Sequence, residues 1–302
     1  MPNAKLKNYL HLHFLVFIAG FTAILGELIS IGSLELVWYR MSIAGILMYL
    51  YIRFVGISLK VPKKVIVQFS VAGIIIALHW ITFFEAINQA NISIALAMFS
   101  TGAFFASFVE PIFFKRSILG YEMVFGFIVI IGVVLITSSE IEYLYGIVLG
   151  LLSAFFSTLF AVINGRFILK HKASVISFYE FVSGVIFLTV FLLLMGKSFD
   201  SSFFALPKSD WIYLFILASI CTAYAFIGAV EVMRYISPFT VILSYNLEPV
   251  YGIALALILF PESEVMSLEF YLGALLVLST VILDAYLKNR QTAINKRKIL
   301  KD

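Results

Sequence analysis

Long apolar stretches follow one another along almost the whole chain, separated by short polar segments. Residues 124–136 and 271–283, for example, contain no charged side chain. A helix needs about 20 mostly apolar residues to cross a bilayer core that is about 30 Å thick. The pattern therefore predicts an all-α polytopic membrane protein with ten transmembrane helices. We place them near residues 10–30, 34–54, 65–86, 92–114, 120–138, 144–168, 174–195, 210–232, 237–260 and 267–287.

Two other interpretations of the apolar pattern fit less well. A membrane β-barrel needs segments of about 10 residues that alternate polar and apolar side chains, whereas these stretches are continuously apolar. The first stretch follows Lys5 and Lys7, as a secretory signal peptide would. It runs past the apolar length of about 7–15 residues typical of signal peptides, and no cleavage site built on small residues ends it. We interpret it as a helix of the mature protein.

Basic residues between the spans predict the orientation of the chain. If the N-terminus is cytoplasmic, the outer segments hold only Lys197 and Lys208, and Arg40 falls within a span. All other Lys and Arg residues then lie on the cytoplasmic side, as the positive-inside rule requires. We therefore expect an integral protein of the plasma (inner) membrane with both termini in the cytoplasm.

Composition excludes several other classes of protein. Hydrophobic residues make up 62% of the chain and charged residues only 13%, against roughly 25% in soluble domains. A soluble enzyme, a disordered chain and a nucleic-acid-binding protein are thereby excluded. The net charge of +4 follows from the cytoplasmic basic residues and does not indicate an anionic partner. We expect no catalytic residues, cofactor or metal. The chain has one cysteine, Cys221. Gly196-Lys-Ser198 resembles the end of a phosphate-binding loop, but Phe191 stands where that loop needs a glycine.

The second half of the chain echoes the first. Leu36-Val-Trp-Tyr-Arg40 matches Ile176-Ser-Phe-Tyr-Glu180, and Asn91-Ile-Ser93 matches Tyr235-Ile-Ser237. Each repeat contains five spans, so the second repeat enters the membrane from the opposite side. Such inverted repeats are typical of secondary transporters. We assign residues 1–138 and 139–288 to two inverted five-helix repeats and residues 289–302 to a basic cytoplasmic tail.

Several local motifs accompany the repeats. Tyr39-Arg40 lies early in the second span, and the second half contains Leu247-Glu-Pro249, Phe260-Pro-Glu262 and Gly273. With these motifs, nearly the whole chain resembles the EamA-type permeases of the drug/metabolite transporter superfamily. The resemblance implies export or exchange of small metabolites, with both termini in the cytoplasm.

Polar side chains within the spans are the candidate functional residues, because burying them in a bilayer is costly and they usually face a cavity or a partner. Arg40 and Glu180 occupy equivalent positions in the repeats. Inversion puts them nearer opposite membrane faces, so we expect no direct ion pair. Pro249, halfway through the ninth span, is expected to kink the helix. The candidate substrate-binding residues are Arg40, His79, Trp80, Asn164, Glu180, Tyr224, Tyr245, Asn246 and Glu248.

Structural roles stay open for three of these residues. Glu248 could cap a neighbouring helix, Arg40 could snorkel or bond to helix ends, and Trp80 could belong to the interfacial aromatic belt. The sequence favours a secondary transporter of amino acids or related metabolites that works by alternating access. A passive facilitator or channel is the alternative. The expected partners are the lipid bilayer, a small metabolite and, as a candidate coupling ion, the proton, whereas no nucleic acid is expected.

Overall fold

Helices make up most of the computed structural model, which describes residues 2–115, 117–118, 120–236, 241, 244–245 and 247–299. The first half contains α1 (Pro2–Leu28), α2 (Ser33–Val55), α3 (Lys63–Gln89), α4 (Ile92–Phe99), α5 (Gly102–Phe114) and α6 (Gly120–Ser139). The second half contains η1 (Ile141–Tyr143), α7 (Leu144–Phe167), α8 (Ala173–Leu194), α9 (Lys208–Ala218), η2 (Ser219–Tyr224), α10 (Ala225–Val232), α12 (Glu248–Leu259), α13 (Pro261–Glu264) and α14 (Leu268–Ile299). None of these described elements is a strand.

Among the residues that the structure describes, seven helical stretches are long and apolar enough to cross a membrane. They confirm an all-helical membrane protein, whereas the predicted number of ten spans is not confirmed. Helix α2 is outside this set, and the apolar parts of α12 and α14 are shorter than a full span. The seven stretches are Leu6–Leu28, Lys63–Gln89, Ile92–Phe114, Gly120–Ser139, Ile141–Phe167, Ala173–Leu194 and Lys208–Val232.

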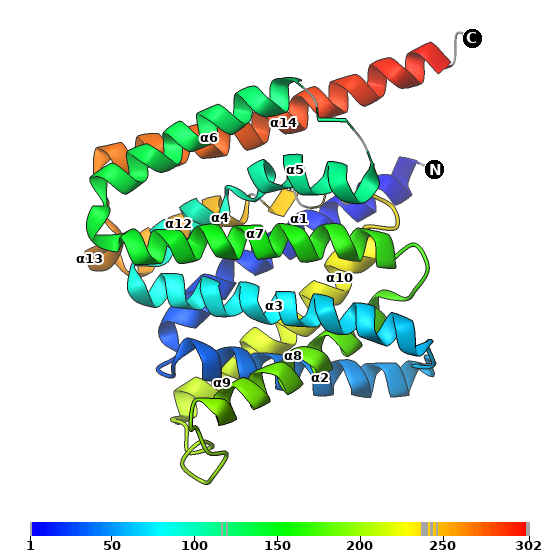
Figure 1. The fold of residues 1–302 in the computed structure, drawn as a ribbon, viewed down its shortest axis with the longest axis vertical. Coiled ribbons are helices and arrows are strands. Elements are labelled where there is room, and N and C mark those ends of the chain that lie inside the picture. The colour runs from blue at the N-terminus through cyan, green and yellow to red at the C-terminus, as the bar shows by residue number, and fades with distance from the viewer. Residues whose placement is uncertain are drawn as a thin grey trace.

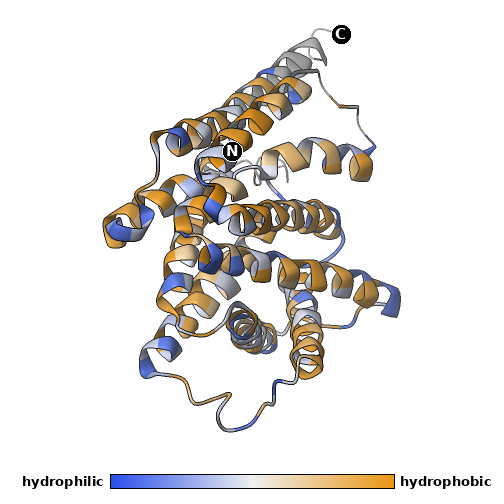
Figure 2. Ribbon diagram, turned by 60° about the vertical axis from the view of Figure 1, so that its left-hand side comes forward, coloured by the Kyte–Doolittle hydropathy of each residue, from blue (hydrophilic) through white to orange (hydrophobic). Residues whose placement is uncertain are grey.

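Hydrophobic residues predominate along most of the helices, which are largely orange in Figure 2. Large side chains such as Phe54, Ile112 and Leu194 are exposed, with relative exposures of 93%, 76% and 81%. A water-soluble protein rarely exposes so much contiguous apolar surface, which therefore suits contact with lipid. The interior is filled by fully buried aromatic rings, including Phe69 and Phe181.

The helices of the two halves pack in corresponding pairs. Helix α1 packs against α12, and its counterpart α7 packs against α5. Helices α6 and α14 lie side by side along one edge of the molecule (Figure 1). They cross so closely that a Cβ atom on Gly132 would lie 2.8 Å from the carbonyl oxygen of Gly273. Glycine at this crossing lets the two backbones touch.

Helices α2 and α8 pack against each other and run in opposite directions. The Trp38 indole donates to Thr189 Oγ1 at 2.8 Å near one end of the contact. Near the other end, the rings of Tyr49 and Phe178 lie 5.8 Å apart. Helix α8 also crosses α3, where a Cβ atom on Gly73 would collide with the carbonyl oxygen of Glu180. This close crossing fixes where the Glu180 backbone lies.

Three spans are interrupted. The fourth span breaks between α4 and α5, and the eighth contains the π-helix η2. In the ninth span, α12 begins at Glu248 with Pro249 in its first turn, after a turn at Leu247. Pro249 therefore occupies a helix start, where a proline is tolerated because its missing N–H would have no intrahelical partner. Interrupted helices inside membranes are tolerated only where protein or a cavity surrounds them.

Candidate functional site

A cavity of about 140 Å³ lies in the centre of the bundle, between the two halves of the chain. Its walls come from α1, α2, α3, the break between α4 and α5, α7, η2, α10 and the start of α12. Six of the predicted site residues line it. They are Arg40, His79, Trp80, Asn164, Tyr245 and Glu248.

Arg40 of α2 is the cation of the cavity. Its side chain is 3% exposed, its Nε donates to Thr222 Oγ1 at 2.6 Å, and its Cζ lies 4.0 Å from the centre of the Trp80 ring. Trp80 therefore contacts the guanidinium through a cation–π interaction, which indicates more than an interfacial role. The Nη1 nitrogen has no hydrogen-bond partner. Arg40 thus has one buried guanidinium nitrogen without a partner.

The π-helix η2 positions this arginine. Thr222 donates its hydroxyl hydrogen to the Leu217 carbonyl oxygen at 2.7 Å and accepts from Arg40. Such π-helical turns occur frequently at functional sites. Cys221, the preceding residue, also lines the cavity.

Glu248 places a carboxyl group on the same cavity as Arg40. It is 7% exposed and begins α12. Arg40 and Glu248 interact electrostatically across the site, although they do not form a direct ion pair. Tyr245 lines the wall beside Glu248, whereas Asn246 lies outside the described residues. The cavity wall therefore includes both a cation and a carboxyl group.

His79 is held firmly on the cavity wall. Its Nδ1 lies 3.0 Å from the carbonyl oxygen and 2.9 Å from the hydroxyl oxygen of Ser153 on α7. The imidazole also stacks on Phe99, with ring centres 5.5 Å apart. These contacts join α3, α4 and α7 around the cavity. A further bond, from Thr158 Oγ1 to the Gly102 carbonyl oxygen at 3.0 Å, joins α7 to the start of α5.

Glu180 and Tyr224 do not line the cavity. Glu180 is fully buried behind Asn164, whose Nδ2 donates to Glu180 Oε2 at 3.5 Å. Tyr224 points outward with 46% exposure, and its hydroxyl contacts His11 Nε2 at 3.0 Å. Direct substrate contact by Tyr224 is therefore not supported by its position. Thr222, which was not among the predicted site residues, is the residue of η2 that bonds Arg40.

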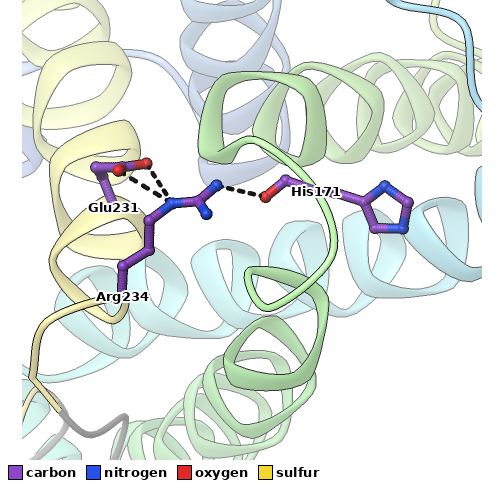
Figure 3. Close-up of polar contacts among 3 residues, drawn as sticks. All are labelled: His171, Glu231 and Arg234. Atoms are coloured by element: carbon purple, nitrogen blue, oxygen red, sulfur yellow. Dashed lines mark hydrogen bonds and ion pairs between the residues drawn. The ribbon is translucent and has the colours of Figure 1, made fainter.

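Polar contacts close the two ends of the bundle differently. At the end where α4 begins, both carboxyl oxygens of Glu264 accept backbone N–H groups, from Ile92 at 3.0 Å and Ser93 at 2.8 Å. At the opposite end, Arg234 forms an ion pair with Glu231 and donates to the His171 carbonyl oxygen at 2.7 Å (Figure 3). The first contact is buried and the second is exposed.

The fold and cavity define a class: a polytopic helical membrane protein with a mostly apolar cavity that carries a few polar and charged side chains. A family model, the EamA-like transporter family, matches the chain twice, over residues 7–138 and 144–284. The chain belongs to this family. The resemblance to EamA-type permeases of the drug/metabolite transporter superfamily is thereby confirmed, and the protein is a membrane transporter of small solutes. Members of the family are transporters rather than enzymes.

Comparison of structures agrees on the fold. A solved structure titled "Crystal structure of protein" superposes with a TM-score of 0.67 at 14% sequence identity, covering 94% of this chain and 98% of that chain. At this identity the likeness concerns the fold alone. No curated protein sequence matches the chain.

Proposed function

We propose that the protein is a secondary transporter that exports amino acids or related small metabolites by alternating access. The observation that carries this proposal is the presence of both Arg40 and Glu248 on the wall of one cavity. A buried guanidinium with a free Nη1 suits a carboxylate, and a carboxylate suits an ammonium group. A zwitterionic solute would satisfy both groups at once.

The walls between these charges suit an apolar body. Trp80, Phe83 and Phe160 contribute aromatic surface, and Tyr245 adds a hydroxyl near Glu248. Mostly apolar walls with a few placed polar groups are typical of small-molecule sites. We therefore assign the substrate's charged groups to Arg40 and Glu248, and its apolar part to the aromatic wall.

The remaining predicted residues take supporting roles in this proposal. His79 and Asn164 contribute polar atoms to the wall. The two halves act as inverted repeats of ten spans in total, over residues 1–138 and 139–288, in a plasma membrane with both termini in the cytoplasm. Rocking of the halves would open the cavity to each face in turn.

Flux into liposomes tests the proposal. The purified protein is reconstituted, the liposomes are loaded with an unlabelled amino acid or metabolite, and uptake of the same labelled compound is measured. We expect saturable counterflow for at least one zwitterionic compound. Flux that does not saturate would instead favour a passive facilitator. Absence of flux for every amino acid and metabolite tested would contradict transport of this substrate class.

The matched variants are Arg40→Ala and Arg53→Ala. Both remove an arginine from α2, but Arg53 is exposed near the end of the helix whereas Arg40 is buried at the cavity. Only Arg40→Ala should abolish saturable counterflow. Equal flux in both variants would show that Arg40 is not part of the substrate site.

A further inference from the structure

Glu180 is the most deeply buried acidic side chain described that has no cation beside it. Its relative exposure is 0%, and its single hydrogen bond comes from Asn164 Nδ2, at 3.5 Å to Oε2. The other carboxyl oxygen, Oε1, has no partner. A charged carboxylate in such a place would lack compensation, and burial of an uncompensated charge is strongly unfavourable.

The side chain of Asn164 has an acceptor that lacks a hydrogen-bond donor. Its Oδ1 also has no partner, although the residue is 99% buried, with 1% relative exposure. One hydrogen bond joins the two facing groups, and one oxygen of each group is unused. A proton on Glu180 Oε1 would supply the missing donor, because a neutral carboxylic acid donates one hydrogen bond and an amide oxygen accepts it. A carboxylic acid and a carboxamide would then pair through two hydrogen bonds.

No charged group on the neighbouring helices neutralises Glu180. Helices α2, α3 and α10 pack against α8, and α7 contributes Asn164. Arg40 of α2 is directed to Thr222 and Trp80, and His79 of α3 to Ser153. Arg166 of α7 is exposed, and Glu231 of α10 pairs with Arg234. Throughout the described part of the chain, Glu180 forms no ion pair.

We propose that Glu180, with Asn164 as its hydrogen-bond partner, is the site that carries a coupling proton. Asn164 lines the cavity and Glu180 lies directly behind it, so the pair links the substrate site to the buried acid. When the halves rock, the wall at Asn164 opens Glu180 to water, and a proton binds the carboxylate to give a neutral acid in the enclosed state. It returns to water when the opposite face opens. This inference rests on the proposed transport function and adds the ion that drives it.

Liposomes with an imposed pH gradient test the proton site. The probe is a zwitterionic compound for which the wild-type protein shows counterflow. With one proton moved per solute, each pH unit supports about tenfold accumulation of solute. We expect accumulation to follow the pH gradient and an equal sodium gradient at constant pH to have no effect. Accumulation driven by sodium, or independent of both gradients, would overturn the proton site on the wild-type protein alone.

The variant Glu180→Gln sharpens this test. Its amide supplies a permanent donor to Asn164 and imitates the protonated acid, so we expect about a tenfold loss of accumulation per pH unit while counterflow stays measurable. Glu180→Asp keeps a titratable group and should keep coupling. Glu262→Gln, an exposed carboxylate on α13, is the matched control.

Each outcome has a distinct meaning. Full pH-driven accumulation by Glu180→Gln would overturn the proposal. If Glu180→Gln fails to fold, loss of coupling in folded Glu180→Asp, judged by a symmetric gel-filtration peak, would overturn it, and retained coupling would support it. Absence of counterflow in the wild-type protein would contradict the transport function itself.

Discussion

Arg40 and Glu180 occupy equivalent positions in the two repeats, yet their surroundings differ. Arg40 reaches the central cavity, stacks on Trp80 and keeps a free Nη1. Glu180 stays behind the cavity wall, with the amide of Asn164 as its partner. The backbones that carry them pack as an antiparallel pair, α2 against α8, so the difference lies in the side chains.

This contrast indicates that equivalent positions in two structural repeats can have different chemical roles. The paired helices give two similar scaffolds, and each side chain is then fixed by its own neighbours. On α2 the threonine of η2 holds the guanidinium at the cavity. On α8 the close crossing with Gly73 fixes the Glu180 backbone against α3, and the Glu180 side chain contacts Asn164. We propose that the first position contacts substrate and that the second carries a proton.

The largest effect is expected from removing the cavity cation. Arg40→Ala should lower flux at low solute concentration by about 100-fold, because loss of one partner of a buried charged contact costs about 3 kcal/mol. Arg40→Lys keeps the charge but loses the geometry of the guanidinium fork and should recover only part of the flux. Initial rates of labelled uptake provide the measurement. Unchanged rates in Arg40→Ala would remove the distinction between positions 40 and 180.

A smaller effect is expected at the carboxyl group of the cavity, Glu248. Glu248→Gln keeps size and hydrogen bonding but removes the charge, so we expect the apparent affinity for a zwitterionic solute to fall by about tenfold, or about 1.4 kcal/mol. A solute without an ammonium group should not be affected. Kinetics measured across pH give the readout. Wild-type kinetics throughout that range would exclude Glu248 from the site.

The crossing of α3 and α8 is tested through stability. Gly73→Ala should destabilise the protein by about 1–3 kcal/mol, because its new methyl group meets the backbone of Glu180 rather than a side chain that can move. Gly45→Ala on α2 is the matched control, since its Cβ would lie 3.8 Å from Phe181 Cβ, an ordinary contact. Thermal unfolding in detergent compares the two. Equal midpoints would show that the crossing is looser than the structure describes.

The smallest effect is expected at the exposed end of α10. Arg234→Ala removes the ion pair with Glu231 and the bond to the His171 carbonyl oxygen, as drawn in Figure 3. Exposed ion pairs contribute about 0–1 kcal/mol, so unfolding should change little. Thermal unfolding should therefore differ from wild type by less than for Gly73→Ala. A larger fall in the midpoint of thermal unfolding would show that this exposed contact stabilises the fold.

Much of the fold follows from the sequence because the bilayer imposes a simple pattern. Observed helices such as α6 and α8 begin and end within a few residues of the predicted spans. Interruptions were harder to foresee. Pro249 signals one break, but the break between α4 and α5 follows Ser100 and Thr101, which are compatible with a continuous helix.

The candidate site was only partly predictable, because the sequence shows which residues are charged but not which way their side chains point. Charged residues such as Arg40 and Glu248 stand out in an apolar span, whatever their neighbours. Rotation about a helix is harder to infer where a π-helical turn shifts the register, as η2 does. That shift brings Thr222 rather than Tyr224 toward Arg40. Whether a buried acid faces the cavity, as Glu248 does, or the wall, as Glu180 does, depends on helix packing that no local pattern encodes.

The central claim is that the cavity is the substrate site and opens to alternate faces of the membrane. Cys221, the single cysteine of the chain, lines that cavity and reports on it directly. The measurement is the rate at which a charged methanethiosulfonate reagent modifies Cys221 in vesicles of each orientation, with Cys221→Ser as the blank. We predict that a transported solute changes the rate in opposite directions from the two faces, and that modification stops flux. Equal rates with and without such a solute, from both faces, would contradict the account.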